Sequence, residues 1–227
     1  MADAFGEMLR SGTDVEIVER DDGFIQGATL SYFAPVRRWS TVERRALRFV
    51  RGRVLDVGVG AGRVALELQA RGREAVAIDI SPGAVEVARK RGVRDVRLLA
   101  LEDVDASLGH LDTVVMYGNN FGLFASRAKA RRLLRRLRPI ADRIVASSND
   151  PYATDDPAHL AYQAQNRKRS RMSGQLRLRI RYRDLVGPWF EYLIVSPDEM
   201  ADIVGGTGWQ ISRIVQDEGS PYVAVLD

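Results

Sequence analysis

Short apolar runs alternate with amphipathic segments through the middle of the chain, beginning near residue 53. Each run suits a buried strand, and each following segment repeats its apolar residues at helical spacing. This alternation predicts a doubly wound parallel sheet. We expect five strands, at about 53–57, 74–78, 95–100, 112–117 and 143–147, with helices over about 62–71, from Ser81-Pro82 to Gly92, and over about 126–138.

The pattern changes after residue 149. A polar stretch with a helical segment around 160–162 comes first. From 175 to 184 apolar residues alternate strictly with arginines, which predicts a half-buried strand with a hairpin partner at 189–195. A helix from 196 and a closing antiparallel pair at 209–215 and 222–226 complete the chain. The expected fold class is α/β, a Rossmann-like doubly wound seven-stranded sheet, mostly parallel with an antiparallel last strand, that carries an inserted helix plus β-hairpin.

These elements divide the chain into three parts. We expect an N-terminal helical lead-in over 1–52, where Ser40 or Thr41 can cap a helix that ends at Gly52. The core is expected over 53–149 and 196–227. The segment 150–195 interrupts this core, and we interpret it as an inserted substrate-recognition element.

The chain has 34 lysine and arginine residues against 30 aspartates and glutamates, a formal net charge of +4. All the basic residues except Lys90, Lys129 and Lys168 are arginines, which favour bidentate pairing with carboxylate or phosphate. A modest excess of this size does not establish nucleic-acid binding. The absence of cysteine excludes disulfides, thiolate metal sites and a thiol nucleophile, and we expect no metal site.

No run approaches the roughly 18 apolar residues that a membrane span needs. The first residues, Met1-Ala2-Asp3-Ala4-Phe5, lack the positive region and apolar core of a signal peptide. We therefore expect a cytoplasmic protein that has no membrane partner and is a monomer or a homodimer.

Three glycines follow the first predicted strand at alternate positions, Gly58, Gly60 and Gly62. A glycine turn between a buried strand and a helix start forms a cofactor cradle, because glycine lets a ligand approach the backbone and the helix start offers free N–H groups. A dinucleotide site needs a third glycine one position later, where this chain has Arg63. Asp79 ends the second strand and can accept both hydroxyls of a ribose.

The segments Leu55-Asp56-Val57-Gly58-Val59-Gly60-Ala61-Gly62 and Ala77-Ile78-Asp79-Ile80-Ser81-Pro82 together resemble the class I S-adenosylmethionine-dependent methyltransferases. The resemblance covers about 50–150, with a tail at 196–227. It implies S-adenosylmethionine as the cofactor and S-adenosylhomocysteine as the product.

The resemblance also implies roles for single residues. The backbone at Gly58, Gly60 and Gly62 would pack against the methionine part of the cofactor, and Asp56 would help hold its amino group. Asp79 would take the ribose hydroxyls. The adenine would lie between Ile80 and the pair Leu101 and Glu102, although this chain has Ala100 where the family commonly has an acid.

The end of the fourth strand faces the methyl group in this family, and here it is Tyr117-Gly118-Asn119-Asn120-Phe121. We assign Tyr117 and Asn119 to the cofactor site and consider Asn119 and Asn120 as catalytic residues, because amide oxygens can accept from a substrate amine or hydroxyl. The alternative is that the two asparagines only form a turn. The (Asp/Asn)-Pro-Pro-(Tyr/Phe) tetrad of amino-N DNA methyltransferases is absent.

His159 in the inserted segment is the candidate general base, and a packed or exposed imidazole is the alternative. His110 precedes the fourth strand and is expected to be structural. The alternating arginines of 177–183 either contact phosphates or form the solvated face of a strand, and we favour the solvated face.

The function expected is in-line methyl transfer from S-adenosylmethionine to nitrogen or oxygen of a small molecule. The alternatives are an RNA or protein methyltransferase that uses the arginine-rich face, and a non-catalytic relative that binds the cofactor.

Overall fold

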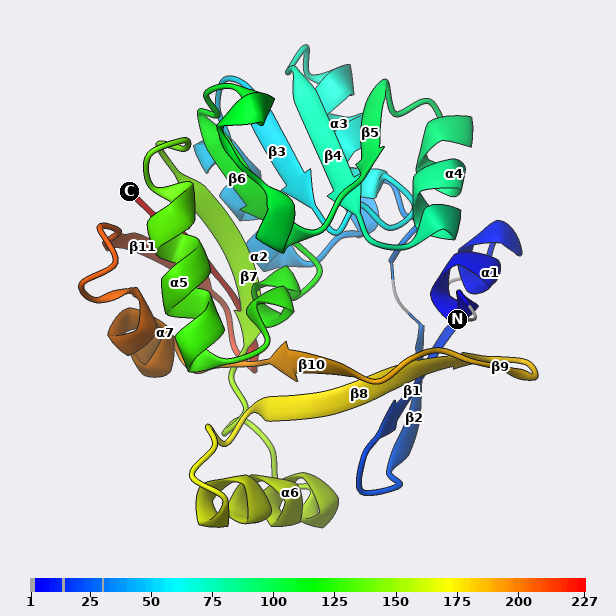
Figure 1. The fold of residues 1–227 in the computed structure, drawn as a ribbon, viewed down its shortest axis with the longest axis vertical. Coiled ribbons are helices and arrows are strands. Elements are labelled where there is room, and N and C mark those ends of the chain that lie inside the picture. Colours follow the sequence, from blue (N-terminus) through cyan, green and yellow to red (C-terminus); the bar gives the residue numbers. More distant parts are fainter. Residues whose placement is uncertain (1–2, 14, 30) are drawn as a thin grey trace.

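The computed structural model describes residues 3–13, 15–29 and 31–227. Met1 and Ala2, on which the expectation about a signal peptide partly rests, lie outside the described residues, as do positions 14 and 30 of the predicted lead-in. Two sheets organise the molecule. Figure 1 shows the larger sheet and the helices that flank it in the upper part of the molecule, and the second sheet crossing beneath them.

The larger sheet has seven strands in the order β11-β12-β7-β6-β3-β4-β5. Five are parallel: β3 (Val54–Val57), β4 (Ala75–Asp79), β5 (Asp95–Leu98), β6 (Thr113–Met116) and β7 (Ile144–Asn149). The last strand, β12 (Pro221–Leu226), is antiparallel to β7 and to β11 (Ile211–Gln216). The predicted fold class is therefore confirmed.

Helices cover both faces of this sheet because its central strands are apolar on both sides. On one face, α5 (Arg127–Leu137) and α7 (Pro197–Val204) pack against Leu55 and Ile78. On the other face, α2 (Thr41–Ala46) and α3 (Arg63–Ala70) pack against Val54, and α4 (Pro82–Lys90) lies beside α3. The predicted cap of α4 is present, since Ser81 Oγ accepts from the Ala84 N–H at 3.0 Å and Pro82 begins the helix.

The second sheet combines the predicted inserted hairpin with strands from the N-terminus. Its order is β10-β8-β1-β2, and β9 extends from β8. The bounds are β1 (Val15–Arg20), β2 (Ile25–Thr29), β8 (Gln175–Tyr182), β9 (Leu185–Val186) and β10 (Phe190–Leu193). The helix α6 (Pro157–Lys168) precedes β8, as the sequence predicts.

The expectation of a wholly helical lead-in over 1–52 is wrong for 15–29. Helices do form at α1 (Ala4–Arg10) and α2, but the residues between them include the hairpin β1–β2. β1 pairs with β8, where Val18 lies opposite Ile180. The partner that makes 15–20 a strand is therefore about 160 residues away in the chain, so local sequence does not indicate it.

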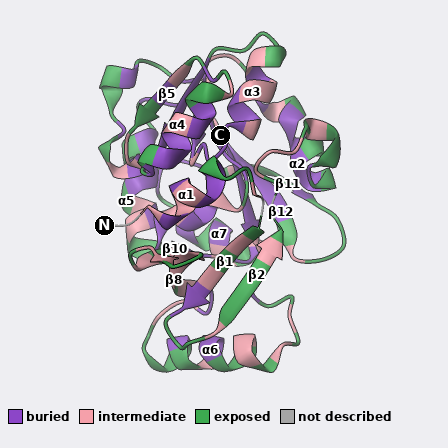
Figure 2. Cartoon of the chain, turned by 90° about the vertical axis from the view of Figure 1, so that its right-hand side faces the viewer, coloured by how far each residue is buried: buried purple, intermediate pink, exposed green. Residues whose placement is uncertain are grey.

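Burial follows this arrangement. Figure 2 shows buried residues concentrated in the larger sheet and its helices, while α6 and the outer face of β2 are mostly exposed or half-buried. Across the described part of the chain, no helix has the length and apolar character that a membrane crossing requires.

Candidate active site

The glycine turn joins β3 to α3 at the carboxyl end of the sheet. All three glycines have positive φ, 75° at Gly58, 52° at Gly60 and 85° at Gly62. A Cβ atom at Gly58 would lie 2.5 Å from Asn120 Nδ2, and one at Gly62 would lie 2.7 Å from Val93 Cγ2. Glycine is therefore required here by both backbone conformation and space.

Two buried carboxylates flank this turn. Asp56 Oδ2 accepts from the Ala65 N–H at 3.1 Å, in the first turn of α3. Burial raises the pKa of Asp56 to about 7. Asp79 Oδ2 accepts from the Gly60 N–H at 3.0 Å, and Asp79 Oδ1 accepts from the Ser81 N–H at 2.9 Å. Burial also raises the pKa of Asp79. The two carboxylates thus both lie beside the glycine turn.

The predicted adenine side is only partly assembled. Ile80 follows β4 with 72% of its surface exposed, as an apolar platform for a planar ring would be. Leu101 is buried in the core below. Glu102 instead forms an ion pair with Lys129 of α5, so its carboxylate is turned towards that helix. This placement differs from the predicted role of Glu102.

Neighbouring side chains at the end of β6 point to opposite faces of the sheet. Tyr117 is 3% exposed and packs edge-on against Trp39, with 6.2 Å between the ring centroids. It lies in the core between α2 and the sheet, which differs from its predicted place in the cofactor site. The alternation of strand residues explains this, because Met116 belongs to the core of the opposite face.

Asn119 and Asn120 form different hydrogen bonds. Asn119 adopts a left-handed conformation, φ 68°, and its N–H donates to Ser147 Oγ at 2.7 Å. Its side-chain Oδ1 is buried without a hydrogen-bond partner among the described residues. Asn120 Nδ2 donates to the carbonyls of Val57 at 2.8 Å and Gly58 at 3.2 Å. Asn120 therefore holds the glycine turn, while Asn119 offers a free acceptor.

A cavity of about 370 Å³ extends from Asn119 towards α6, and we call it the inter-sheet cavity. The inner face of the second sheet forms one wall. The carboxyl ends of β6 and β7 and one side of α6 form the others. Its lining includes Val18, Arg20, Leu176, Leu178 and Tyr192 from the second sheet, Asn119, Asn149 and Asp150 from the core, and His159, Tyr162 and Gln163 from α6.

His159 lines this cavity from α6, as predicted for a helix that covers the pocket. Its Nδ1 lies 3.1 Å from Arg20 Nη1. A guanidinium can only donate, so Nδ1 is the acceptor and the ring proton is on Nε2. The Arg20 side chain is itself held by Asp22 at 2.7 Å and 2.8 Å. The nitrogen of His159 that could take a proton is therefore already occupied.

The N-terminal segment covers the glycine turn, which the sequence did not indicate. A Cβ atom at Gly60 would lie 3.3 Å from the ring of Tyr32 and 3.9 Å from that of Phe5. Asp3 fixes this segment, because its Oδ2 accepts from the Gly83 N–H at 2.8 Å and its Oδ1 accepts from Ser81 Oγ at 2.8 Å. No local motif marks Asp3, Phe5 or Tyr32.

The comparisons with known proteins agree with this geometry. A family model described as a methyltransferase domain matches residues 54–140. The fold is similar to a crystal structure of a SAM-dependent methyltransferase from Bacteroides fragilis in complex with S-adenosyl-L-homocysteine, with a TM-score of 0.80 and 26% identity. That likeness covers 99% of this chain and 92% of the other. The chain belongs to the class I S-adenosylmethionine-dependent methyltransferases. The predicted cofactor and enzyme class are thereby confirmed.

Two further similar proteins are both magnesium-protoporphyrin methyltransferases. The methyltransferase is 39% identical to the magnesium-protoporphyrin O-methyltransferase of Rhodobacter capsulatus over 67 residues, 28% of this chain and 30% of that enzyme's length. It resembles in fold the magnesium protoporphyrin IX methyltransferase ChlM of Synechocystis PCC 6803, with a TM-score of 0.53 and 16% identity over 82% of this chain and 80% of that one. The first match covers a minor part of that enzyme and the second concerns fold alone.

Proposed function

We propose that this methyltransferase transfers a methyl group to nitrogen or oxygen of a small molecule bound in the inter-sheet cavity. The observation that carries this proposal is that cavity, which starts at Asn119 beside the glycine turn and holds about 370 Å³. This is near the lower end of the roughly 300–1,000 Å³ typical of ligand pockets. It suits an acceptor that is compact and enclosed.

The chain's own residues would hold both partners in line. When bound, S-adenosylmethionine supplies a methyl group already activated on a sulfonium. The glycine turn, Asp56, Asp79 and Ile80 fit the cofactor, since the turn leaves no room for side chains and Ile80 exposes an apolar surface. Alignment is the main catalytic contribution that such a displacement needs.

The lining of the cavity suits an acceptor with an apolar body and few polar groups. Val18, Leu176 and Leu178 present one apolar wall. Asn119 Oδ1, which has no partner among the described residues, would accept a hydrogen bond from the acceptor's nucleophile. We extend the predicted recognition element 150–195 to include 15–29, since both contribute to this wall.

The arginines of β8 favour the small-molecule proposal over an RNA or protein acceptor. Arg179 and Arg181 both pair with Glu19, at 2.6 Å each, on the outer face of the second sheet. Arg177 lies 3.9 Å from Glu191. These charges are already paired and point away from the cavity.

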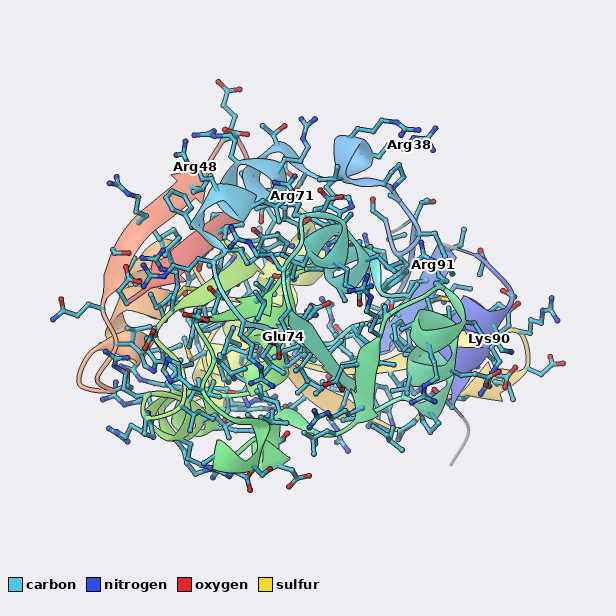
Figure 3. All side chains as sticks on the ribbon, turned by 90° about the horizontal axis from the view of Figure 1, so that it is seen from above. Arg38, Arg48, Arg71, Glu74, Lys90 and Arg91 are labelled. Atoms are coloured by element: carbon cyan, nitrogen blue, oxygen red, sulfur yellow. The ribbon has the colours of Figure 1, made fainter. Side chains whose placement is uncertain are left out.

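Figure 3 views the amino end of the parallel strands, where Arg48, Arg71 and Glu74 lie opposite the glycine turn.

The test combines binding with turnover. Calorimetry should detect S-adenosylhomocysteine, and a panel of small amines, phenols and carboxylic acids should include one that releases S-adenosylhomocysteine from S-adenosylmethionine. Binding of NADH instead would refute the cofactor site. Turnover on RNA or protein alone would refute the small-molecule acceptor, and tight cofactor binding without turnover on any acceptor would favour the non-catalytic alternative.

A further inference from the structure

A further carboxylate, that of the half-buried Glu16 in β1, lies on the inner face of the second sheet. Glu16, Val18 and Arg20 share this face because alternate strand residues point the same way. Val18 and Arg20 line the inter-sheet cavity. The side chain of Glu16 is hydrogen-bonded to Tyr32, whose hydroxyl must donate to the ionised carboxylate. Glu16 therefore lies on the same face of β1 as two residues that line the cavity.

Tyr32, the hydrogen-bond partner of Glu16, lies over the glycine turn. Its ring lies over Gly60, at 3.3 Å from the Cβ position there. Tyr32 also lies near Asp79 and Tyr192, since the negative charges of both groups raise its pKa. Tyr192 in turn donates its hydroxyl to the Asn119 carbonyl at 2.6 Å.

Among the described residues, no positive charge lowers the raised pKa of Glu16. The groups that face it are the hydroxyls of Tyr32 and Tyr192, and Tyr182 packs into the same cluster as Tyr32. Burial raises the pKa of Glu16, and the hydrogen bond from Tyr32 partly opposes this. Glu19, on the opposite face of the same strand, is instead paired with two arginines.

An acceptor that brings its own positive charge would compensate this carboxylate. Glu16 and Asn119 Oδ1 are both hydrogen-bond acceptors, one without a cation and one without a partner among the described residues. An ammonium group offers two or three N–H donors, whereas a hydroxyl offers one. A buried carboxylate is stabilised most when it gains an opposite charge and a hydrogen bond together.

We propose that Glu16 binds a protonated amine as the methyl acceptor and removes its proton before transfer. This inference rests on the proposed function. Glu16 takes one proton from the ammonium, which leaves a lone pair on nitrogen. That pair forms the N–C bond to the methyl group while the C–S bond breaks, and its electrons stay on sulfur. The products are the methylated ammonium and S-adenosylhomocysteine, with the proton on Glu16. Burial raises the pKa of Glu16, and a carboxylate that binds a proton more readily is a better general base.

Sinefungin provides a probe that needs no identified acceptor, because it carries an amine on carbon where S-adenosylmethionine carries the methyl on sulfur. Calorimetry at pH 8 should show wild-type protein binding sinefungin more tightly than S-adenosylhomocysteine. Glu16→Gln should reduce that preference roughly 10-fold or more, the value of a charged hydrogen bond. Glu19→Gln is the matched control on the same strand and should keep the preference.

The outcomes separate the two proposals. If neither compound binds wild-type protein, the proposed function fails. If both bind and Glu16→Gln keeps the full preference for sinefungin, the role of Glu16 is overturned and the proposed function stands.

A pH series distinguishes a charged contact from a structural one. The preference for sinefungin requires ionised Glu16, so it should disappear as the pH falls through the Glu16 pKa. Tyr32→Phe removes the hydrogen bond that lowers this pKa, and the preference should then disappear at a higher pH. An unchanged pH profile in Tyr32→Phe would contradict the coupling of Tyr32 to Glu16.

Discussion

Single side chains at the carboxyl end of the sheet serve the fold and the ligand together. Asp79 already accepts from Gly60 and Ser81, yet each carboxylate oxygen retains a further lone pair for a ribose hydroxyl. The same carboxylate thus holds the glycine turn and, in the proposed function, would also accept from the ribose hydroxyls. Substitutions here must be judged by affinity and by stability separately.

Replacing Asp79 should weaken S-adenosylhomocysteine binding. We expect Asp79→Asn to raise the dissociation constant roughly 10- to 100-fold, because a hydrogen bond to a charged group contributes about 1.5–3 kcal/mol. Calorimetry measures the affinity, and circular dichroism checks that the variant is folded. Glu74→Gln, at the opposite end of the strands, is the control and should bind normally. Unchanged affinity in Asp79→Asn would exclude a ribose role.

Alanine substitutions of the two neighbouring asparagines should affect different quantities, turnover in one case and cofactor affinity in the other. Asn119→Ala removes the Oδ1 acceptor, which has no partner among the described residues, from a residue that lines the cavity. We expect kcat to fall roughly 10-fold or more with a smaller change in cofactor affinity. Asn120→Ala releases the carbonyls of Val57 and Gly58, so cofactor affinity should fall first. Steady-state kinetics on an acceptor from the panel and calorimetry measure the two quantities. The reverse order would place Asn119 in the cofactor site.

At the level of elements, one buried ion pair joins α2, α3 and the loop after β6. Arg63 donates to both oxygens of Glu43, at 2.9 Å and 3.0 Å, and the Gly118 N–H donates to Glu43 Oε1 at 2.7 Å. The residue that departs from the dinucleotide pattern, Arg63, thus connects the start of the cofactor helix to the N-terminal part of the core.

Glu43→Gln should lower the free energy of unfolding by about 3 kcal/mol, because it leaves the buried Arg63 without a counter-charge. Urea denaturation measures this change. Glu67→Gln removes a surface pair with Arg71 one helical turn away, and it should cost less than about 1 kcal/mol. Equal effects of the two substitutions would contradict the special place of the Glu43–Arg63 pair.

At the level of the whole molecule, stability should fall as pH rises towards neutrality because of Asp56. Its pKa is raised from 3.8 to about 7 by burial, so between these values the folded chain holds a proton that the unfolded chain has lost. Folding then binds protons, and the free energy of unfolding decreases with pH across this window by up to about 4 kcal/mol.

Other carboxyl groups titrate in the same range, so the test compares the pH dependence of stability in Asp56→Asn with that of the wild-type protein. Asp56→Asn should be less sensitive to pH than wild type between pH 4.5 and 7.5 in urea denaturation, and the difference between the two proteins should become constant above pH 8. Parallel curves across the whole range would show that Asp56 titrates normally.

Much of the core and part of the site could be predicted because their signals are local. The run Val54–Val57, the glycine turn and the Ser81-Pro82 helix start each lie within a dozen residues. The second sheet lacks such a signal at its N-terminal half, where β1 becomes a strand only by pairing with β8. β6 is buried on both faces, so its sequence does not show to which face the side chain of Tyr117 points.

The sequence by itself determined the doubly wound sheet and the cofactor turn, since apolar periodicity and glycine conformation act between near neighbours. Only the tertiary structure decided that Asn120 supports this turn, that β8 arginines are paired with Glu19, and that Tyr32 covers Gly60 and is hydrogen-bonded to Glu16. These placements arise from contacts between residues far apart in the chain. Long-range packing determines these placements, so a local sequence pattern does not predict them.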